Sequence, residues 1–139
     1  MAGYSGTPLP QKLGIKPGAR LAFSRAPASF EKALGKLPGG AKPTTLGRAK
    51  GPFDVVVAFF DGEADFKTNL PRLQALLEPN GGLWIAWPKR ASGVQTDMTE
   101  DVVRKHALPR GLVDNKVCAI DETWTGLRLV VRLENRRRG

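Results

Sequence analysis

Charged and hydroxylated side chains, together with one tryptophan, stand at the ends of three strands that the sequence predicts. These residues are Ser24, Arg25, Asp61, Trp87, Lys89, Arg90 and Ser92. In open α/β sheets, ligands bind beyond the carboxyl ends of the strands. We therefore expect this set to form a binding site, and its guanidinium and ammonium groups favour an anionic ligand.

The sharpest part of this site is the corner at Trp87, where Lys89 and Arg90 follow after one proline. Two cations beside an aromatic face could clamp an anionic group. The alternative is that Trp87 is a core residue and the basic pair is solvated, because buried parallel strands are covered on both faces. Alternation along the strand sends Trp84 and Trp87 to opposite faces, and we expect Trp84 to be buried.

The loop after the first strand lacks the residues of a nucleotide cofactor site. A dinucleotide or adenosyl group needs a glycine-rich turn there, so that backbone amides can approach it. The loop reads Ser24-Arg25-Ala26-Pro27-Ala28, in which Pro27 has no amide donor. An acid for the ribose hydroxyls is also absent from residues 44–47. The sequence therefore predicts no cofactor.

Other catalytic and metal-binding chemistry has few candidate residues. The chain has one cysteine, Cys118, and one histidine, His106, which excludes an internal disulfide and the usual zinc motifs. We expect Cys118 to be a small core residue and His106 to stabilise the last turn of a helix. Asp61 could pair with Glu63 or Asp65 for acid–base or metal chemistry, although stabilisation of a helix N-terminus explains these carboxylates more simply.

Positive charge is concentrated in the first third of the chain. The 139 residues have a net charge of +9, with a balance of +8 in residues 1–52, −2 in 53–109 and +3 in 110–139. A basic segment of this kind attracts polyanions, so nucleic-acid binding is one hypothesis. A solvated surface is the simpler alternative, because no aromatic residues alternate with the basic ones as in base-stacking platforms.

Hydrophobic periodicity predicts strands that alternate with helices. The strands are expected at residues 20–24, 44–46, 53–60, 83–87, 117–120 and 127–133. The helices are expected at residues 28–37, 63–77 and 98–106, the second of them interrupted at Pro71. This order predicts an α/β fold with a mostly parallel sheet and a final antiparallel hairpin.

The predicted organisation is an extended arm over residues 1–18, one α/β domain over 19–134 and a basic tail over 135–139. No apolar run approaches the roughly 20 residues of a membrane span. The N-terminus also lacks an apolar signal core, so we expect a cytoplasmic protein.

Two segments resemble parts of class I methyltransferases. Residues 16–21 (KPGARL) are similar to the beginning of the first strand in that fold, and residues 76–85 (LLEPNGGLWI) to a late helix-to-strand joint. The closing helix and hairpin are also similar. The resemblance implies a three-layer Rossmann-like domain, a truncated methyltransferase-type scaffold without its cofactor turn.

The whole chain resembles a bacterial family known as domain of unknown function 3052. The similar segments are YSGTPL (4–9), KLGI (12–15), WIAWPK (84–89), ASGV (91–94), TDMTE (96–100), GLVDNKVCA (111–119) and DETWTGL (121–127). The family implies a compact Rossmann-like domain from bacteria and no assigned catalytic residue.

These observations favour a non-catalytic binding or regulatory module whose partner is an anionic small molecule or a protein. Two alternatives remain: a nucleic-acid-binding regulator that uses the basic first third, and a diverged adenosylmethionine-dependent methyltransferase. We expect no membrane partner, and the sequence leaves the oligomeric state open.

Overall fold

Six strands form one sheet within residues 7–45 and 51–133, the part of the chain that the computed structural model describes. The strands are β1 (Arg20–Ser24), β2 (Lys42–Thr45), β3 (Phe53–Phe59), β4 (Leu77–Pro88), β5 (Leu112–Ala119) and β6 (Trp124–Val131). The helices are α1 (Leu9–Lys12), α2 (Ala28–Leu34), α3 (Glu63–Ala75) and α4 (Glu100–Ala107), with short 3₁₀ turns η1 (Arg90–Ser92) and η2 (Leu108–Arg110).

The sheet has the strand order β2-β1-β3-β4-β6-β5. The pairs β1–β2, β1–β3 and β3–β4 are parallel, whereas β6 pairs antiparallel with both β4 and β5. The predicted α/β fold, with a mostly parallel sheet and a C-terminal antiparallel hairpin, is therefore confirmed.

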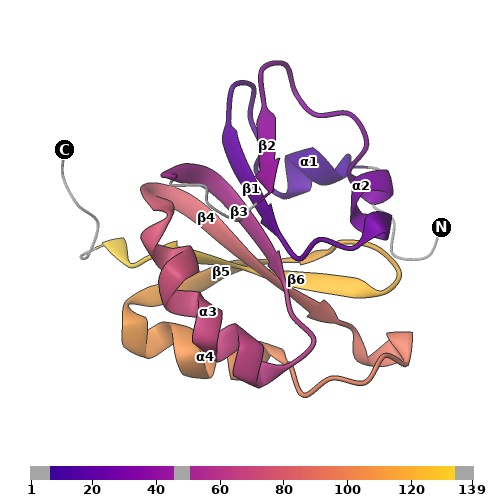
Figure 1. Ribbon diagram of the computed structural model, residues 1–139, viewed down its shortest axis with the longest axis vertical. Helices are drawn as coiled ribbons and strands as arrows, with labels where there is room; N and C mark the ends of the chain where they lie inside the picture. Colours follow the sequence, from indigo (N-terminus) through magenta and orange to yellow (C-terminus); the bar gives the residue numbers. More distant parts are fainter. Residues whose placement is uncertain (1–6, 46–50, 134–139) are drawn as a thin grey trace.

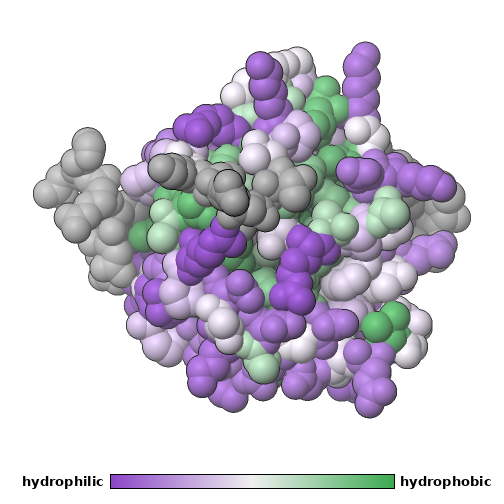
Figure 2. Space-filling view, in the orientation of Figure 1, coloured by the Kyte–Doolittle hydropathy of each residue, from purple (hydrophilic) through white to green (hydrophobic). Residues whose placement is uncertain are grey.

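Central strands β3 and β4 are apolar on both faces, which requires a helical layer on each side. Helices α3 and α4 cover one face and α1 and α2 the other (Figure 1). Trp87 lies in the core under α3 and α4, and Trp84 in the core on the opposite face. The predicted alternation of the two tryptophans is confirmed. In the view of Figure 2 the outer surface over α3 and α4 is mostly hydrophilic, as expected for amphipathic helices.

Residues 9–15 are part of the core packing on the second face. Leu13 is fully buried, and Leu9 and Ile15 are nearly so. The indole Nε1 of Trp84, itself fully buried, donates a hydrogen bond of 3.0 Å to the carbonyl oxygen of Leu13. This bond ties the segment before β1 to the centre of the sheet. The domain boundary after residue 18 stays a prediction, and residues 1–6 lie outside the described part.

Helix α3 differs from its prediction, because it runs without a break through Pro71. Asn69 caps no second helical piece before Pro71, because its amide Nδ2 donates to the carbonyl oxygen of Asp65, one turn earlier, at 2.8 Å. Burial of Phe66, Leu70 and Leu73 on one side holds both halves of the helix against the sheet. Tertiary packing thus overrides the local cost of the proline.

Most other elements agree with their predictions to within three residues at their ends. Strands β4 and β5 are the exceptions, because they begin at Leu77 and Leu112 rather than at residues 83 and 117. Helix α2 ends at Leu34, before Gly35, where φ is +67°. The predicted tail over 135–139 lies outside the described residues. Within the described residues, no helix has the length and apolarity that a membrane crossing requires.

We predict that Trp84→Phe lowers the free energy of unfolding by about 1–3 kcal/mol beyond its loss of packing, because the buried Leu13 carbonyl loses its donor. Urea denaturation followed by circular dichroism measures this change. Trp87→Phe is the matched control, since Trp87 is also buried but its indole makes no such bond among the described residues. Equal losses for the two variants would contradict the assigned role of the Trp84 hydrogen bond.

Candidate functional site

The sheet has a topological switch point between β1 and β3, where the order in which strands are added changes direction. From β1 it passes through α2 to the edge strand β2, whereas from β3 it passes through α3 to β4 on the other side. Parallel α/β sheets bind ligands beyond the carboxyl ends of the strands at such a switch point. We call the residues at and directly after the ends of these two strands the switch edge: Ser24, Arg25, Phe60 and Asp61. Register pairing of Ser24 with Ala58 brings the two strand ends to the same level.

Arg25 has the most unusual backbone of the switch edge. Its φ is +60°, the left-handed region that glycine favours, and it is the one non-glycine residue with positive φ among residues 7–45 and 51–133. The chain therefore makes a sharp turn directly after β1 without a glycine. The strain lies in the loop of residues 24–28, which contains no glycine.

The Arg25 side chain reaches from β1 to the β3 side of the switch edge. Its guanidinium carbon lies 5.4 Å from the centre of the Phe60 ring. Its Nη2 donates to the carboxylate Oδ2 of Asp65, in the first turn of α3, at 3.0 Å. Both side chains of this ion pair are about half exposed, so the pair is open to exchange with other ions.

The remaining predicted site residues follow β4, the next strand along. Strand β4 lies two strands away from β1, and the register places its Ile85 at the level of Ser24, so β4 continues for three residues beyond the end of β1. Ser92 is engaged in its own turn, because its hydroxyl donates to the Lys89 carbonyl at 2.7 Å and accepts from the Val94 amide at 3.1 Å. Arg90 is exposed, Lys89 is half-buried and the Trp87 side chain is buried in the core.

The structure thus places Ser24, Arg25 and Asp61 at the ends of the neighbouring strands β1 and β3, whereas Lys89, Arg90 and Ser92 follow β4, which extends further. The Trp87 ring lies in the core, which agrees with the prediction that Trp87 is a core residue rather than part of an anion clamp. A joint ligand site for the whole set stays a prediction.

Sequence reasoning missed a second polar cluster, which joins the start of α3 to α4. The carboxylate Oε2 of Glu63 lies 2.7 Å from His106 Nε2 and accepts from Lys105 Nζ at 3.0 Å. These hydrogen bonds, first from His106 and then from Lys105, hold the pKa of Glu63 below its ordinary value. His106 therefore fixes α4 against α3, rather than only stabilising its own last turn.

The loop before α4 also contacts the start of α3. Asp97 Oδ1 accepts from the Glu63 backbone amide at 2.7 Å, and Thr96 Oγ1 donates to the Asp61 carbonyl at 2.7 Å. The spacing of Asp97 and Glu100 predicts a cap for α4, but Thr99 caps that helix and Asp97 serves α3. Thr96 and Asp97 therefore fix the backbone of Asp61 and Glu63, which lie 35 and 34 positions earlier in the chain.

Metal and thiol chemistry find little support in the described residues. No group of three or more acidic, histidine or cysteine side chains there could hold a metal ion. Cys118 is buried, and burial raises the pKa of its thiol, which disfavours the reactive thiolate.

Solved structures identify the fold. The chain is similar to a type 11 methyltransferase from Sulfolobus solfataricus (TM-score 0.65, 14% identity, 94% of this chain and 93% of that chain covered). It is also similar to a SAM-dependent methyltransferase from Aquifex aeolicus (TM-score 0.63, 14% identity, 87% of each chain covered). A third similar structure is Aeropyrum pernix fibrillarin with natively bound S-adenosyl-L-methionine (TM-score 0.58, 15% identity, 92% and 70% covered). No family model and no curated protein matches the chain. The domain therefore has the methyltransferase-type fold that its sequence resembles.

The prediction that the domain has no cofactor is corrected by these comparisons. Among the similar structures, the Aquifex aeolicus protein is a SAM-dependent methyltransferase, and the fibrillarin holds S-adenosyl-L-methionine itself. The prediction treated glycine as indispensable after the first strand. In the structure, the turn after the first strand has a positive φ at Arg25, a conformation that glycine usually provides.

The lowered pKa of Glu63 predicts a pH-dependent stability. A carboxylate with a depressed folded-state pKa stabilises the fold above its unfolded value, near 4.5, and loses that contribution as pH falls through the lower folded value. We expect the melting temperature of the wild type to fall more steeply than that of Glu63→Gln between about pH 5 and pH 3. Thermal melts across this range measure it. Glu31→Gln, at an exposed position of α2, should keep the wild-type slope. The same slope in Glu63→Gln would refute the assignment.

Proposed function

We propose that this chain is a diverged adenosylmethionine-binding domain of the methyltransferase type, with the ligand at the switch edge. The observation that carries the proposal is Arg25: a non-glycine residue with φ of +60° stands directly after the first strand, at the point where this fold class binds ligands. Residues held in such conformations cluster at ligand-binding sites, where the surrounding structure maintains them.

The methionyl end of the ligand fits the residues of the switch edge. It carries a carboxylate and an ammonium group. The Arg25 guanidinium, about half exposed, has the fork of donors that binds carboxylates in pairs of hydrogen bonds. The exposed carboxylate of Asp61, across the switch edge, suits the ammonium group. The half-buried hydroxyl of Ser24 adds a further donor and acceptor.

The ribose end has fewer partners. Residues 32–52, which include β2, contain no Asp or Glu that could accept from the ribose hydroxyls. Pro27 also removes one amide from the turn after β1. We therefore expect the chain to hold the ligand mainly by its methionyl end, and more weakly than a site with both sets of contacts.

When bound, adenosylmethionine supplies an electrophilic methyl group on its sulfonium sulfur. The roles of this chain's own residues are to bind and orient. Arg25 fixes the carboxylate, and the bonds of Thr96 and Asp97 to the following loop and helix hold Asp61 in place. Membership of the family of unknown function 3052 and a cytoplasmic location belong to the same proposal.

Isothermal titration with adenosylhomocysteine tests the proposal. We expect binding by the wild type and, for Arg25→Gly, a loss of about 10- to 100-fold in affinity, because a charge-assisted pair is removed. Glycine suits the positive φ, so this variant should fold. Asp65→Asn removes the carboxylate that occupies Arg25 and should tighten binding by about two- to fivefold.

Lys67→Gln is the charge-matched control for Arg25→Gly, because Lys67 is exposed on α3 and contributes nothing to the switch edge. It should bind like the wild type. No heat from the wild type, with no rise in its melting temperature, would overturn the proposal. Equal affinities of Arg25→Gly and the wild type would overturn the role of Arg25.

Nucleic-acid binding is a second candidate, favoured by the surface of residues 7–45. The exposed basic side chains there are Lys16, Arg20, Arg25, Lys32, Lys36 and Lys42. Within that range only Arg25 forms an ion pair, so the remaining charges are available to phosphates. Fluorescence anisotropy with a labelled RNA oligonucleotide should then show affinity that falls steeply as salt is raised. No binding at low salt would exclude this candidate.

A further inference from the structure

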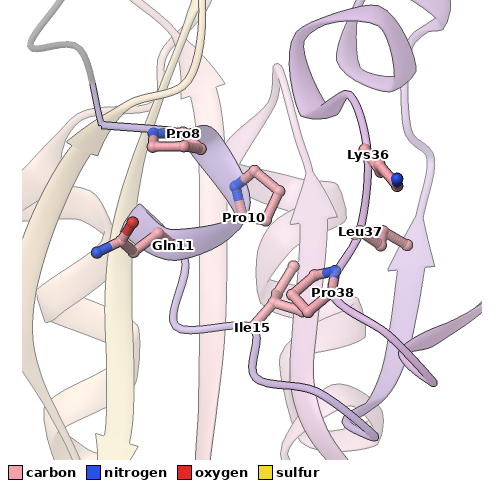
Figure 3. A pocket seen from close by; sticks show the side chains of 7 residues that line it. All are labelled: Pro8, Pro10, Gln11, Ile15, Lys36, Leu37 and Pro38. Atoms are coloured by element: carbon pink, nitrogen blue, oxygen red, sulfur yellow. The ribbon is translucent and has the colours of Figure 1, made fainter.

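A groove lies on the α1 and α2 side of the molecule, away from the residues of the switch edge. It runs between α1 and the segment that connects α2 to β2 and has a volume of about 380 Å³ (Figure 3). We call it the proline groove. It is lined by Pro8, Pro10, Gln11, Ile15, Lys36, Leu37 and Pro38. The volume is within the range of small-molecule sites.

The walls of the proline groove are fixed before any ligand arrives. Proline rings have little conformational freedom to lose. The backbone amide of Gly18 donates to the Gly39 carbonyl at 2.9 Å, which ties the two sides together at one end. Beneath them, Leu13 and Phe30 are fully buried. An apolar wall that is already ordered loses little conformational entropy when a ligand binds.

The polar groups of the groove define what it can recognise. The three proline carbonyls already accept backbone hydrogen bonds: Pro8 from Gln11 and Lys12, Pro10 from Ile15, and Pro38 from Ala41. The prolines also contribute no amide donor. The side chains that remain are the Lys36 ammonium and the Gln11 amide. Figure 3 shows them on opposite walls, with the Gln11 amide pointing away from Lys36.

Lys36 is the only charged residue of the lining. It is exposed and forms no ion pair with the residues described at 7–45 and 51–133. An ammonium group at the rim of an apolar groove complements a ligand with an apolar body and a negative end.

We propose that the proline groove binds a small carboxylic acid with an aromatic or branched apolar body. The body lies against the rings of Pro8, Pro10 and Pro38, and the carboxylate pairs with Lys36. This site is separate from the proposed adenosylmethionine site, since none of the switch-edge residues lines it. The two proposals therefore stand or fall independently.

The test is an NMR titration of the ¹⁵N-labelled full chain with 3-phenylpropionate and, as its neutral match, 3-phenylpropan-1-ol. We expect saturable shifts of the Gln11, Ile15 and Leu37 amides, with a dissociation constant on the order of 1 mM for the acid. The alcohol should bind about two- to fivefold more weakly, as expected for an exposed ion pair.

Lys36→Gln should remove the preference for the acid, whereas Lys32→Gln, one turn earlier on exposed α2, should keep it. Absence of shifts at about 10 mM acid would overturn the proposal, because even fragments of this size reach millimolar affinity in a real site. Equal binding of acid and alcohol, or an unchanged preference in Lys36→Gln, would overturn the role of Lys36. Shifts induced only by an acidic peptide would overturn the small-molecule site and indicate a protein-docking surface instead.

Discussion

Burial of β3 and β4 on both faces is the constraint on which the rest of the structure depends. Six of the seven residues of β3 are buried, and only Asp54 is exposed. A strand of this kind needs a helical layer on each side. Helix α2 covers one face, and α3 and α4 cover the other. Crossover connections on both faces require the strand order to change direction, which it does between β1 and β3. The switch edge is thus a consequence of core packing.

Arg25 connects this architecture to the proposed function. A left-handed conformation costs a residue with a side chain about 1–2 kcal/mol. The guanidinium of the same residue lies over the Phe60 ring and forms an ion pair with Asp65. The carboxylate of Asp65 is chemically the same group as the one that a methionyl ligand would present. Asp65 therefore holds the arginine in place, and in the proposed complex the carboxylate of the ligand would compete with Asp65 for the guanidinium.

Local patterns predict the parts of the fold that depend on burial. The apolar runs around β3 and β4, the opposite directions of Trp84 and Trp87, and the final hairpin could all be predicted from the sequence. The continuity of α3 through Pro71 could not, because three buried side chains in the tertiary structure decide it. The contacts of the site are harder to predict than the fold. Arg25 and Asp65 are 40 positions apart in the sequence, and Glu63 and His106 are 43 apart. No local spacing marks such pairs, and the missing glycine after β1 pointed away from a cofactor.

The most direct measurement is a crystal structure of the full chain grown with adenosylhomocysteine. The account predicts electron density for the ligand across the carboxyl ends of β1 and β3, with its carboxylate on the guanidinium of Arg25 and Asp65 released from that contact. Density at any other place, or a ligand whose carboxylate leaves the Arg25–Asp65 pair intact, would contradict it.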